Sequence, residues 1–371
     1  MDGVLERTRF LSWLKPLASA LYHGDRRLPT GMSDQMTAAV VSEPGAEFEL
    51  VERAVPEPDP GEVRVDVEAC GICHSDAFVM EGTYPAVTYP RVPGHEIAGR
   101  VDAVGEGVER LAAGDRVGVG WHGGHCFECE PCRRGEFTAC ENGDITGLTY
   151  DGGYAEYATV PAEAVATVPE TLDAADAAPL LCAGVTTYNA LRNTDARPGD
   201  LVAVQGIGGL GHLGVQYAHA AGFETVALSR SADKEPLALE LGADHFLDTT
   251  ETDPAERLQE LGGASVVLAT APASEAISSV VGGLGLDGSV VVVGVPGDPI
   301  EVDGAELVGA RSGVEGWASG HARDSQDTLE FSALRDIAPE IETFPLSEVS
   351  AAYERMIDDE ARFRVVLEPG A

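Results

Sequence analysis

The amino-acid sequence predicts an α/β protein that combines a β-rich domain with a doubly wound domain built on a parallel sheet. Before about residue 184, short segments alternate apolar and polar residues and end in glycine turns; after it, continuous apolar segments alternate with alanine-rich stretches. A β-like texture returns near residue 312. We therefore expect a β-rich domain over 36–183, a doubly wound domain over 184–311, and a return to the first domain over 312–371.

The individual strands are predicted from their periodicity. The segment GEVRVDVEAC places Val63, Val65 and Val67 on one face, as in a half-buried strand. AGRVDAVGEGV and GDRVGVG continue this pattern, with glycines at the expected turns. In the doubly wound part, continuous apolar segments are predicted as buried parallel strands. These segments are DLVAVQ, ETVALS, ASVVLAT and SVVVVGV.

Residues 1–35 differ from the rest of the chain. The segment FLSWLKPLASAL is mildly apolar, but Lys15 and Pro16 interrupt it and no clean signal-peptide cleavage site follows. We expect residues 1–35 to be a disordered extension or to lie upstream of the true start codon. The fold then begins near Met32 or Met36, with TAAVV as its first strand.

The composition excludes several classes of partner. The chain has 62 acidic and 24 basic residues, and its net charge of −38 argues against binding to nucleic acid or to anionic membranes. Lys15 and Lys234 are its two lysines, and this acidic, lysine-poor composition predicts a halophilic protein. No apolar run approaches the ~20 residues of a membrane-spanning helix. We expect a cytoplasmic protein.

The doubly wound part opens with a glycine motif directly after a predicted strand. Gly206, Gly208 and Gly211 form G-x-G-x-x-G at the start of a predicted helix, with Gly209 and Leu210 inside the loop. The first glycine permits a tight turn, the second lets a pyrophosphate approach the backbone, and the third allows close helix–strand packing. The helix N-terminus adds positive potential. In this context the motif predicts dinucleotide binding.

The end of the next predicted strand, and the residues that follow it, bear on the choice of cofactor. NAD-preferring folds place an Asp or Glu there, whereas a 2′-phosphate favours cations and hydroxyls. This chain has Ser229, Arg230 and Ser231, followed by Lys234, the only lysine beyond Met36. The sequence therefore favours NADP(H) over NAD(H).

Three sparser motifs contain side chains of the metal-ligand type. ACGICHSD holds Cys73, VPGHEIAGRV holds His95, and PLLCAGVTTYNAL holds Cys182. With these motifs, the chain from about residue 37 onward resembles the zinc-dependent alcohol dehydrogenases of the medium-chain dehydrogenase/reductase family. The resemblance implies a GroES-like catalytic domain and a Rossmann domain. It also implies hydride transfer between NADP(H) and a primary or secondary alcohol, an aldehyde or a ketone.

The resemblance assigns the catalytic zinc to Cys73, His95 and Cys182. Two thiolates and one imidazole leave the fourth tetrahedral position open, and such a metal polarises a carbonyl oxygen and so favours hydride transfer. Asp76 matches the carboxylate that orients the ligand histidine. Glu96 matches an acidic residue near the zinc that can assist ligand exchange.

Further matches concern the substrate and the cofactor. Ser75 matches a hydroxyl that contacts the substrate oxygen and begins a proton relay. In many relatives the relay ends at a histidine three residues later, where this chain has Phe78, so we expect the proton to leave through the cofactor ribose and water. Phe78 and Trp121 match positions near an apolar substrate pocket. The matches to cofactor contacts are His74 at the pyrophosphate, Thr186 at the nicotinamide and Arg364 at the phosphates.

The segment HCFECEPCRRGEFTAC has four cysteines separated by two, two and seven residues. Disulfides fit poorly in a reducing cytosol, and an iron–sulfur cluster is opposed by the last spacing and by the absence of the ferredoxin proline. The resemblance implies a second, structural zinc with four thiolate ligands. These ligands are Cys126, Cys129, Cys132 and Cys140. His122 and His125 are then superfluous, and Cys70 is expected to be a core residue.

Other functions remain to be distinguished. Within the family, the alternatives are a cinnamyl-type broad-specificity aldehyde reductase and an NAD-dependent alcohol dehydrogenase. A zinc-ribbon nucleic-acid module is opposed by the charge, and a zinc-free reductase should lack the ligands that this chain has. By analogy with the family we expect a homodimer or homotetramer acting on a small alcohol or aldehyde.

Overall fold

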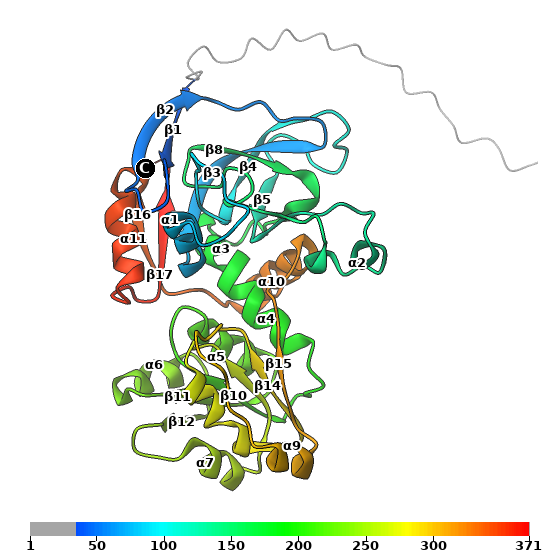
Figure 1. Cartoon of the computed structure of the whole chain (residues 1–371), viewed down its shortest axis with the longest axis vertical. Coiled ribbons are helices and arrows are strands. Elements are labelled where there is room, and N and C mark those ends of the chain that lie inside the picture. The colour runs from blue at the N-terminus through cyan, green and yellow to red at the C-terminus, as the bar shows by residue number, and fades with distance from the viewer. Residues whose placement is uncertain (1–34, 371) are drawn as a thin grey trace, which may run out of the picture. The chain divides into compact units, whose positions relative to one another are not determined.

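The computed structural model describes residues 35–370 (Figure 1). The predicted extension and the alternative start at Met32 lie outside the described residues, except that Gln35 already begins strand β1 (Gln35–Val40). That strand contains TAA and the first valine of the segment TAAVV, as predicted. Among the described residues, no helix is both long and apolar enough to cross a membrane.

A six-stranded parallel sheet forms the second half of the chain, with strand order β12-β11-β10-β13-β14-β15. This is the doubly wound order of dinucleotide-binding folds, and it reverses between β10 and β13, where such sheets bind ligands at the carboxyl ends of their strands. All four predicted parallel strands are present. The strands are β10 (Leu201–Gln205), β11 (Glu224–Ser229), β12 (His245–Asp248), β13 (Ala264–Ala269), β14 (Leu284–Val292) and β15 (Gly313–Gly316).

Both faces of this sheet are covered by helices. Val204 on β10 packs with Val215 of α5 and Ala238 of α6, whereas its neighbour Ala203 packs with Leu258 of α7. Alternate side chains of the central strand therefore enter different cores, as a doubly wound fold requires. The helices of this part are α5 (Gly211–Ala220), α6 (Glu235–Glu240), α7 (Pro254–Glu260), α8 (Ser274–Ser278) and α9 (Gly304–Ala310).

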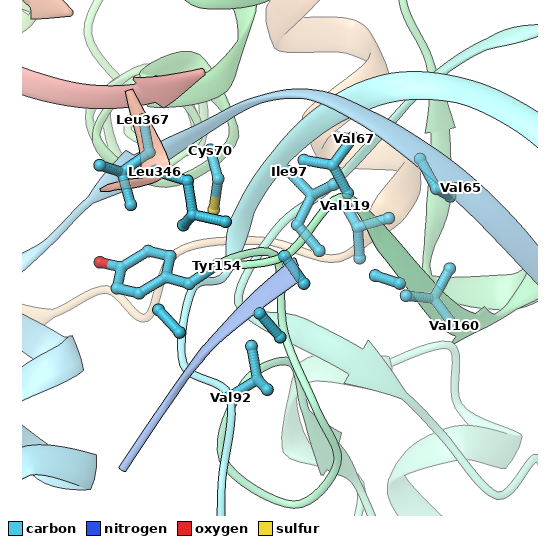
Figure 2. Close-up of a cluster of buried hydrophobic side chains, with 14 of the residues drawn as sticks. Val65, Val67, Cys70, Val92, Ile97, Val119, Tyr154, Val160, Leu346 and Leu367 are labelled. Carbon is cyan, nitrogen blue, oxygen red and sulfur yellow. The ribbon is translucent and has the colours of Figure 1, made fainter. Parts of the chain in front are cut away.

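A second sheet of seven strands forms the β-rich part. Its order is β16-β17-β3-β4-β5-β9, and β8 pairs with β3. Figure 2 shows the core of this part, in which Val65 and Val67 of β3 lie with Ile97, Val119 and Val160. The strands are β3 (Glu62–Ile72), β4 (Glu96–Val104), β5 (Arg116–Val119), β8 (Tyr157–Pro161), β9 (Val165–Thr167), β16 (Ile341–Pro345) and β17 (Arg364–Glu368).

Smaller elements complete this part. Strand β1 pairs with β2 (Glu49–Ala54), and β6 (His122–Gly124) pairs with β7 (Asp144–Ile145). A π-helical turn, Leu180–Gly184, links two helices at the start of the doubly wound part. The helices are α1 (Ala77–Glu81), α2 (Glu130–Arg133), α3 (Ala174–Pro179), α4 (Val185–Arg192), α10 (Ala322–Arg335) and α11 (Val349–Ile357).

The end of the chain differs in detail from the expectation. The predicted boundary at residue 312 precedes β15, which pairs with β14 and so extends the parallel sheet to Gly316. Its sequence GVEG has one apolar side chain, which is why periodicity did not reveal it. The predicted β-like segment after it also contains two helices, α10 and α11. Its last strand, β17, pairs antiparallel with β3.

Candidate functional site: two sulfur-rich clusters and a glycine loop

Cys73, His95, Glu96 and Cys182 come together from three distant segments. Antiparallel pairing of β3 with β4 places the residues after Ile72 beside His95, and the π-helical turn contributes Cys182. The four potential ligand atoms all lie within 4.8 Å of one another. His95 and Glu96 are fully buried, and both cysteines are half-buried.

The geometry of this cluster fits a metal ion better than a disulfide. The Cys73 and Cys182 Sγ atoms are 3.8 Å apart, whereas a disulfide needs about 2 Å. Two thiolates of a tetrahedral zinc, each about 2.3 Å from the metal, would lie about 3.8 Å apart. The His95 Nε2 atom is buried without a hydrogen-bond partner in the described residues. An unpaired imidazole nitrogen beside two thiols is the donor set that zinc prefers.

The carboxylate of Asp76 contacts two residues of this cluster, His95 and Cys73. Its Oδ1 atom lies 3.1 Å from His95 Nδ1, and its Oδ2 atom accepts hydrogen bonds of 2.8 Å from the Cys73 amide and from the Tyr154 hydroxyl. All of the Asp76 side chain is buried. A proton held on Nδ1 leaves the Nε2 lone pair of His95 for a metal.

Glu96 forms a buried ion pair with Arg364 on β17. Arg364 Nη2 donates to Glu96 Oε1 and also to the Ile72 carbonyl at 3.2 Å, while Glu96 Oε2 is buried without a hydrogen-bond partner among residues 35–370. Burial raises the pKa of Glu96 to about 7, although the Arg364 guanidinium opposes this shift. Gly71 makes room for the carboxylate, because a Cβ atom there would lie 1.9 Å from Oε2.

The glycine loop lies at the carboxyl end of β10. Gly206 has φ +93°, which favours glycine, and a Cβ atom on Gly211 would lie 1.8 Å from the Gly206 carbonyl oxygen. Gly208, in contrast, has open space where its Cβ atom would be. The fold itself therefore requires the first and third glycines, and the second leaves room for a cofactor. Gly209 lies beside Arg364, since its Cβ atom would be 3.2 Å from Nη1.

The candidate residues for cofactor selection lie at the end of β11 and directly after it. Ser229 is buried and its hydroxyl accepts a 3.2 Å hydrogen bond from the Ser231 amide, whereas Arg230 is exposed. Lys234 is turned toward the glycine loop: its Nζ donates to the Ile207 carbonyl at 2.6 Å and lies 5.6 Å from the centre of the Phe363 ring. Burial lowers the pKa of Lys234.

Aromatic side chains lie next to the metal-ligand cluster. The Trp121 ring lies edge-on to His95, with centroids 5.0 Å apart, and Phe78 lies 6.2 Å from Trp121. Phe78 also contacts Tyr84 at 6.0 Å, a residue that no sequence motif singles out. With Phe78 39% exposed, these rings form an accessible apolar wall near His95.

The other predicted site residues lie close to the same cluster. His74 and Ser75 occupy the short turn directly after Cys73, where His74 is exposed and Ser75 is half-buried. Thr186 is buried at the start of α4, one helical turn after Cys182. Cys70, in contrast, is fully buried in the core, as predicted, and is not part of the cluster.

The second cluster consists of Cys126, Cys129, Cys132 and Cys140, whose Sγ atoms also lie within 4.8 Å of one another. Cys140 Sγ is 3.5 Å from Cys126 Sγ and 3.8 Å from Cys129 Sγ, too far for disulfides, and all seven cysteines of the chain are free. The Cys129 amide donates to Cys126 Sγ at 3.4 Å and lowers the pKa of Cys126 to about 6, which favours the thiolate. Four thiol ligands fit a closed zinc site.

Comparisons with known proteins agree with both clusters. The family model "Alcohol dehydrogenase GroES-like domain" matches residues 59–170, and "Zinc-binding dehydrogenase" matches residues 209–334. The chain is 46% identical over 329 residues to "Alcohol dehydrogenase patD" of Penicillium expansum, an alignment that covers 89% of this chain and 96% of that protein. The chain belongs to the zinc-containing alcohol dehydrogenase family.

Other members of the zinc alcohol dehydrogenase family are similar over almost their whole length. An alcohol dehydrogenase of Geobacillus stearothermophilus is 40% identical over 334 residues, covering 90% of this chain and 98% of that protein. The structure of a cinnamyl alcohol dehydrogenase of Sorghum bicolor superimposes with a TM-score of 0.81 at 32% identity, covering 90% and 97%. The structure of the cobalt- and zinc-bound alcohol dehydrogenase of Pyrobaculum aerophilum superimposes with a TM-score of 0.80 at 31% sequence identity, covering 90% of this chain and 100% of that chain.

These findings confirm the predicted fold class and the zinc-dependent alcohol dehydrogenase activity. The four-cysteine cluster is the structural zinc site, and the cluster of Cys73, His95, Glu96 and Cys182 is the catalytic one. His122 and His125 lie outside both ligand sets, as expected.

Proposed function

We propose that the protein is an NADP(H)-preferring enzyme that interconverts small or medium alcohols with aldehydes or ketones. The observation that carries the hydride-transfer part of this proposal is the position of Arg364. It pairs with Glu96 in the catalytic cluster and lies beside Gly209 in the dinucleotide loop, so one side chain joins the metal site to the cofactor site. Its second expected role, a contact with the cofactor phosphates, is part of this proposal.

The roles of the side chains follow from their chemistry. Cys73, His95 and Cys182 hold the zinc, and Glu96 lies next to it as an additional carboxylate. When bound, zinc supplies Lewis acidity toward the substrate oxygen, and the nicotinamide cofactor supplies or accepts the hydride. The short turn after Cys73 provides the Ser75 hydroxyl for the substrate oxygen and His74 for the pyrophosphate. Thr186 lies against the nicotinamide.

The aromatic wall of Phe78, Tyr84 and Trp121 favours an apolar substrate. Because Phe78 replaces the histidine that ends the proton relay in many relatives, the Ser75 hydroxyl would release its proton toward the bound cofactor and solvent rather than to a side chain. Steady-state kinetics over a panel of aliphatic and aromatic aldehydes tests the predicted preference for apolar substrates. A preference for aromatic aldehydes over short aliphatic ones would favour the alternative function, a cinnamyl-type aldehyde reductase.

Selection of NADP(H) is assigned to the last residue of β11 and the residues that follow it. Ser229, Arg230 and Ser231 offer hydroxyls and a guanidinium where NAD-preferring folds place an acid. Lys234 assists them, although its bond to the Ile207 carbonyl also supports a loop that either cofactor would use.

Kinetic constants of two variants test this selection. Arg230→Ala should raise the KM for NADPH roughly 10- to 100-fold, the worth of a charge-assisted hydrogen bond, with little change for NADH. Lys234→Ala should raise the KM for NADPH more than that for NADH, by a smaller ratio. A clear NADH preference in the wild type would overturn the proposal and favour the NAD-dependent alternative.

Self-association is proposed from the edge of the parallel sheet. Strand β15 ends the order β12-β11-β10-β13-β14-β15, and exposed apolar side chains lie in the preceding segment: Val295 is 85% exposed and Val308 80%. An open strand edge beside apolar residues favours pairing with a second copy. The molar mass measured by light scattering should correspond to a dimer or tetramer. The mass of a monomer at micromolar concentration would contradict the proposed self-association.

Two further proposals concern the environment. Six zinc-binding thiolates require a reducing compartment, which supports a cytoplasmic location. The excess of 62 acidic over 24 basic residues supports adaptation to high salt. The melting temperature and activity should therefore rise between low and molar KCl, and a fall in both would contradict the adaptation.

A further inference from the structure

Tyr154 lies behind the catalytic zinc site without touching it. Its side chain is fully buried in the core of the β-rich part, and Figure 2 shows the ring with its hydroxyl turned away from Val65 and Val67 of β3. That hydroxyl donates a 2.8 Å hydrogen bond to Asp76 Oδ2. The tyrosine is therefore an apolar core residue at one end and a partner of a buried carboxylate at the other.

The backbone at Tyr154 also lies against the segment that carries His95. The Tyr154 amide donates to the Pro93 carbonyl at 3.0 Å, and the Gly153 amide donates to the Gly94 carbonyl at 2.9 Å. Gly94 has φ +100°, and a Cβ atom there would lie 2.4 Å from the Tyr154 ring. The ring thus packs directly on the residue that precedes the zinc ligand.

We propose that Tyr154 is a positioning residue that fixes the Asp76 carboxylate and, through it, the orientation of the His95 imidazole. The carboxylate has two oxygens: Oδ1 faces His95 Nδ1, and Oδ2 is held by the Tyr154 hydroxyl and the Cys73 amide. With one of these two donors removed, a single hydrogen bond to Oδ2 remains, and the carboxylate is held less firmly against the imidazole. Burial and the neighbouring Asp76 raise the pKa of Tyr154 well above its usual range, so the hydroxyl keeps the proton it donates.

This inference rests on zinc occupying the cluster of Cys73, His95, Glu96 and Cys182. The test is the affinity of that site for zinc, measured by competition with a chelator, and the visible absorption of the cobalt-substituted protein. Tyr154→Phe keeps the ring and removes the hydroxyl. We expect this variant to bind catalytic zinc about tenfold more weakly and to shift the cobalt bands, because outer partners of zinc-binding histidines contribute about 10- to 100-fold in affinity.

Tyr150→Phe is the matched control. Tyr150 is a half-buried tyrosine whose hydroxyl is also bonded, to Thr146 Oγ1 at 2.9 Å and to the Gly123 carbonyl at 3.0 Å, but it makes no bond to Asp76. Loss of the Tyr150 hydroxyl should lower the melting temperature about as much as loss of the Tyr154 hydroxyl does. It should leave the affinity of the catalytic site for zinc unchanged. Because Tyr154 acts through Asp76, Tyr154→Phe should cause little further loss of zinc affinity in an Asp76→Asn background.

Three results would overturn the inference. The first is a Tyr154→Phe variant with the zinc affinity and cobalt bands of the wild type. The second is a Tyr150→Phe variant that loses as much catalytic zinc affinity as Tyr154→Phe does. The third is a Tyr154→Phe/Asp76→Asn double variant whose loss of zinc affinity equals the sum of the losses, in free energy, of the two single variants. Failure of the underlying zinc assignment is distinguishable, since the wild type would then hold fewer than two zinc ions.

Discussion

The structural zinc site takes its four cysteines from residues 126–140, whereas the catalytic site takes its ligands from positions as distant as Cys73 and Cys182, 109 residues apart. The first lies in the lobe formed by residues 122–145, from β6 to β7, where Cys132 is buried and the other three cysteines are half-buried. Its four thiols leave no position open. The second lies around two fully buried side chains, His95 and Glu96, and keeps an imidazole nitrogen and a carboxylate oxygen without partners in the described protein.

The difference shows what holds each site in place. The short spacings and backbone amides of one loop are enough to gather the thiols of Cys126 and Cys140, so the metal itself can organise the lobe. The catalytic ligands are gathered by the pairing of β3 with β4 and by core packing of the π-helical turn. We therefore expect the catalytic ligands to be dispensable for folding and essential for turnover, and the structural ligands to show the reverse.

Cys73→Ala should have the largest effect. It removes one thiolate from the catalytic cluster and should lower kcat at least about a thousandfold, because a catalytic metal contributes several kcal/mol to the transition state. Folding should persist, since the ligand set is held by the pairing of β3 with β4 and by core packing of the π-helical turn. Circular dichroism and the melting temperature check the fold. A variant that keeps wild-type turnover would break the comparison.

Cys129→Ser tests the structural side. The lobe should loosen, with faster proteolysis between β6 and β7 and a free energy of unfolding lower on the order of several kcal/mol, because structural zinc contributes directly to folding. Turnover measured at low temperature should stay within a few-fold of the wild type. If stability is unchanged while turnover is lost, the roles assigned to the two sites are reversed.

Asp76→Asn allows the zinc affinities of the catalytic and structural sites to be compared within a single protein. The amide orients the His95 imidazole less well than the carboxylate does, and catalytic zinc affinity should fall about 10- to 100-fold. Within residues 35–370, the sulfurs of the four-cysteine site are bonded by backbone amides and the Asn142 side chain and by no carboxylate, so its zinc serves as an internal control. Chelator titration should reveal one weakened zinc per chain; two equally weakened zincs would indicate general destabilisation instead.

Acid should weaken the lobe through His122. Burial, reinforced by His125 and His321, lowers the pKa of His122 to about 4, below the about 6.5 of an unfolded histidine. Between these values the unfolded state binds more protons, so stability present above pH 6.5 is lost as the pH falls toward 4, by about 3 kcal/mol or less. In His122→Gln the free energy of unfolding should depend less steeply on pH over this window. An unchanged slope would contradict the assignment.

Much of the fold could be predicted because its signals are local. Alternation at Val63, Val65 and Val67 predicts β3, and the glycine motif predicts the turn after β10. Strand β15 could not be predicted, because GVEG has too little apolar content, and helices α10 and α11 lie in a segment that was expected to be β-like.

The candidate site also has parts that local sequence predicts and parts that depend on long-range contacts. The spacing of the four cysteines is a local signal, whereas grouping Cys73 with Cys182 depended on resemblance to a family. The Glu96–Arg364 pair and the Tyr154–Asp76 bond join residues 268 and 78 positions apart. Such contacts depend on strand pairing and loop packing, for which a single sequence carries no periodic signal.

The central claim is that two zinc ions with different roles share one chain. Zinc content per chain, measured by atomic emission on purified protein together with kcat, tests it most directly. The wild type should hold two zinc ions, Cys73→Ala one with no turnover, and Cys129→Ser one with turnover retained at low temperature. A wild type with one zinc or none, or a fully active Cys73→Ala protein, would contradict the account.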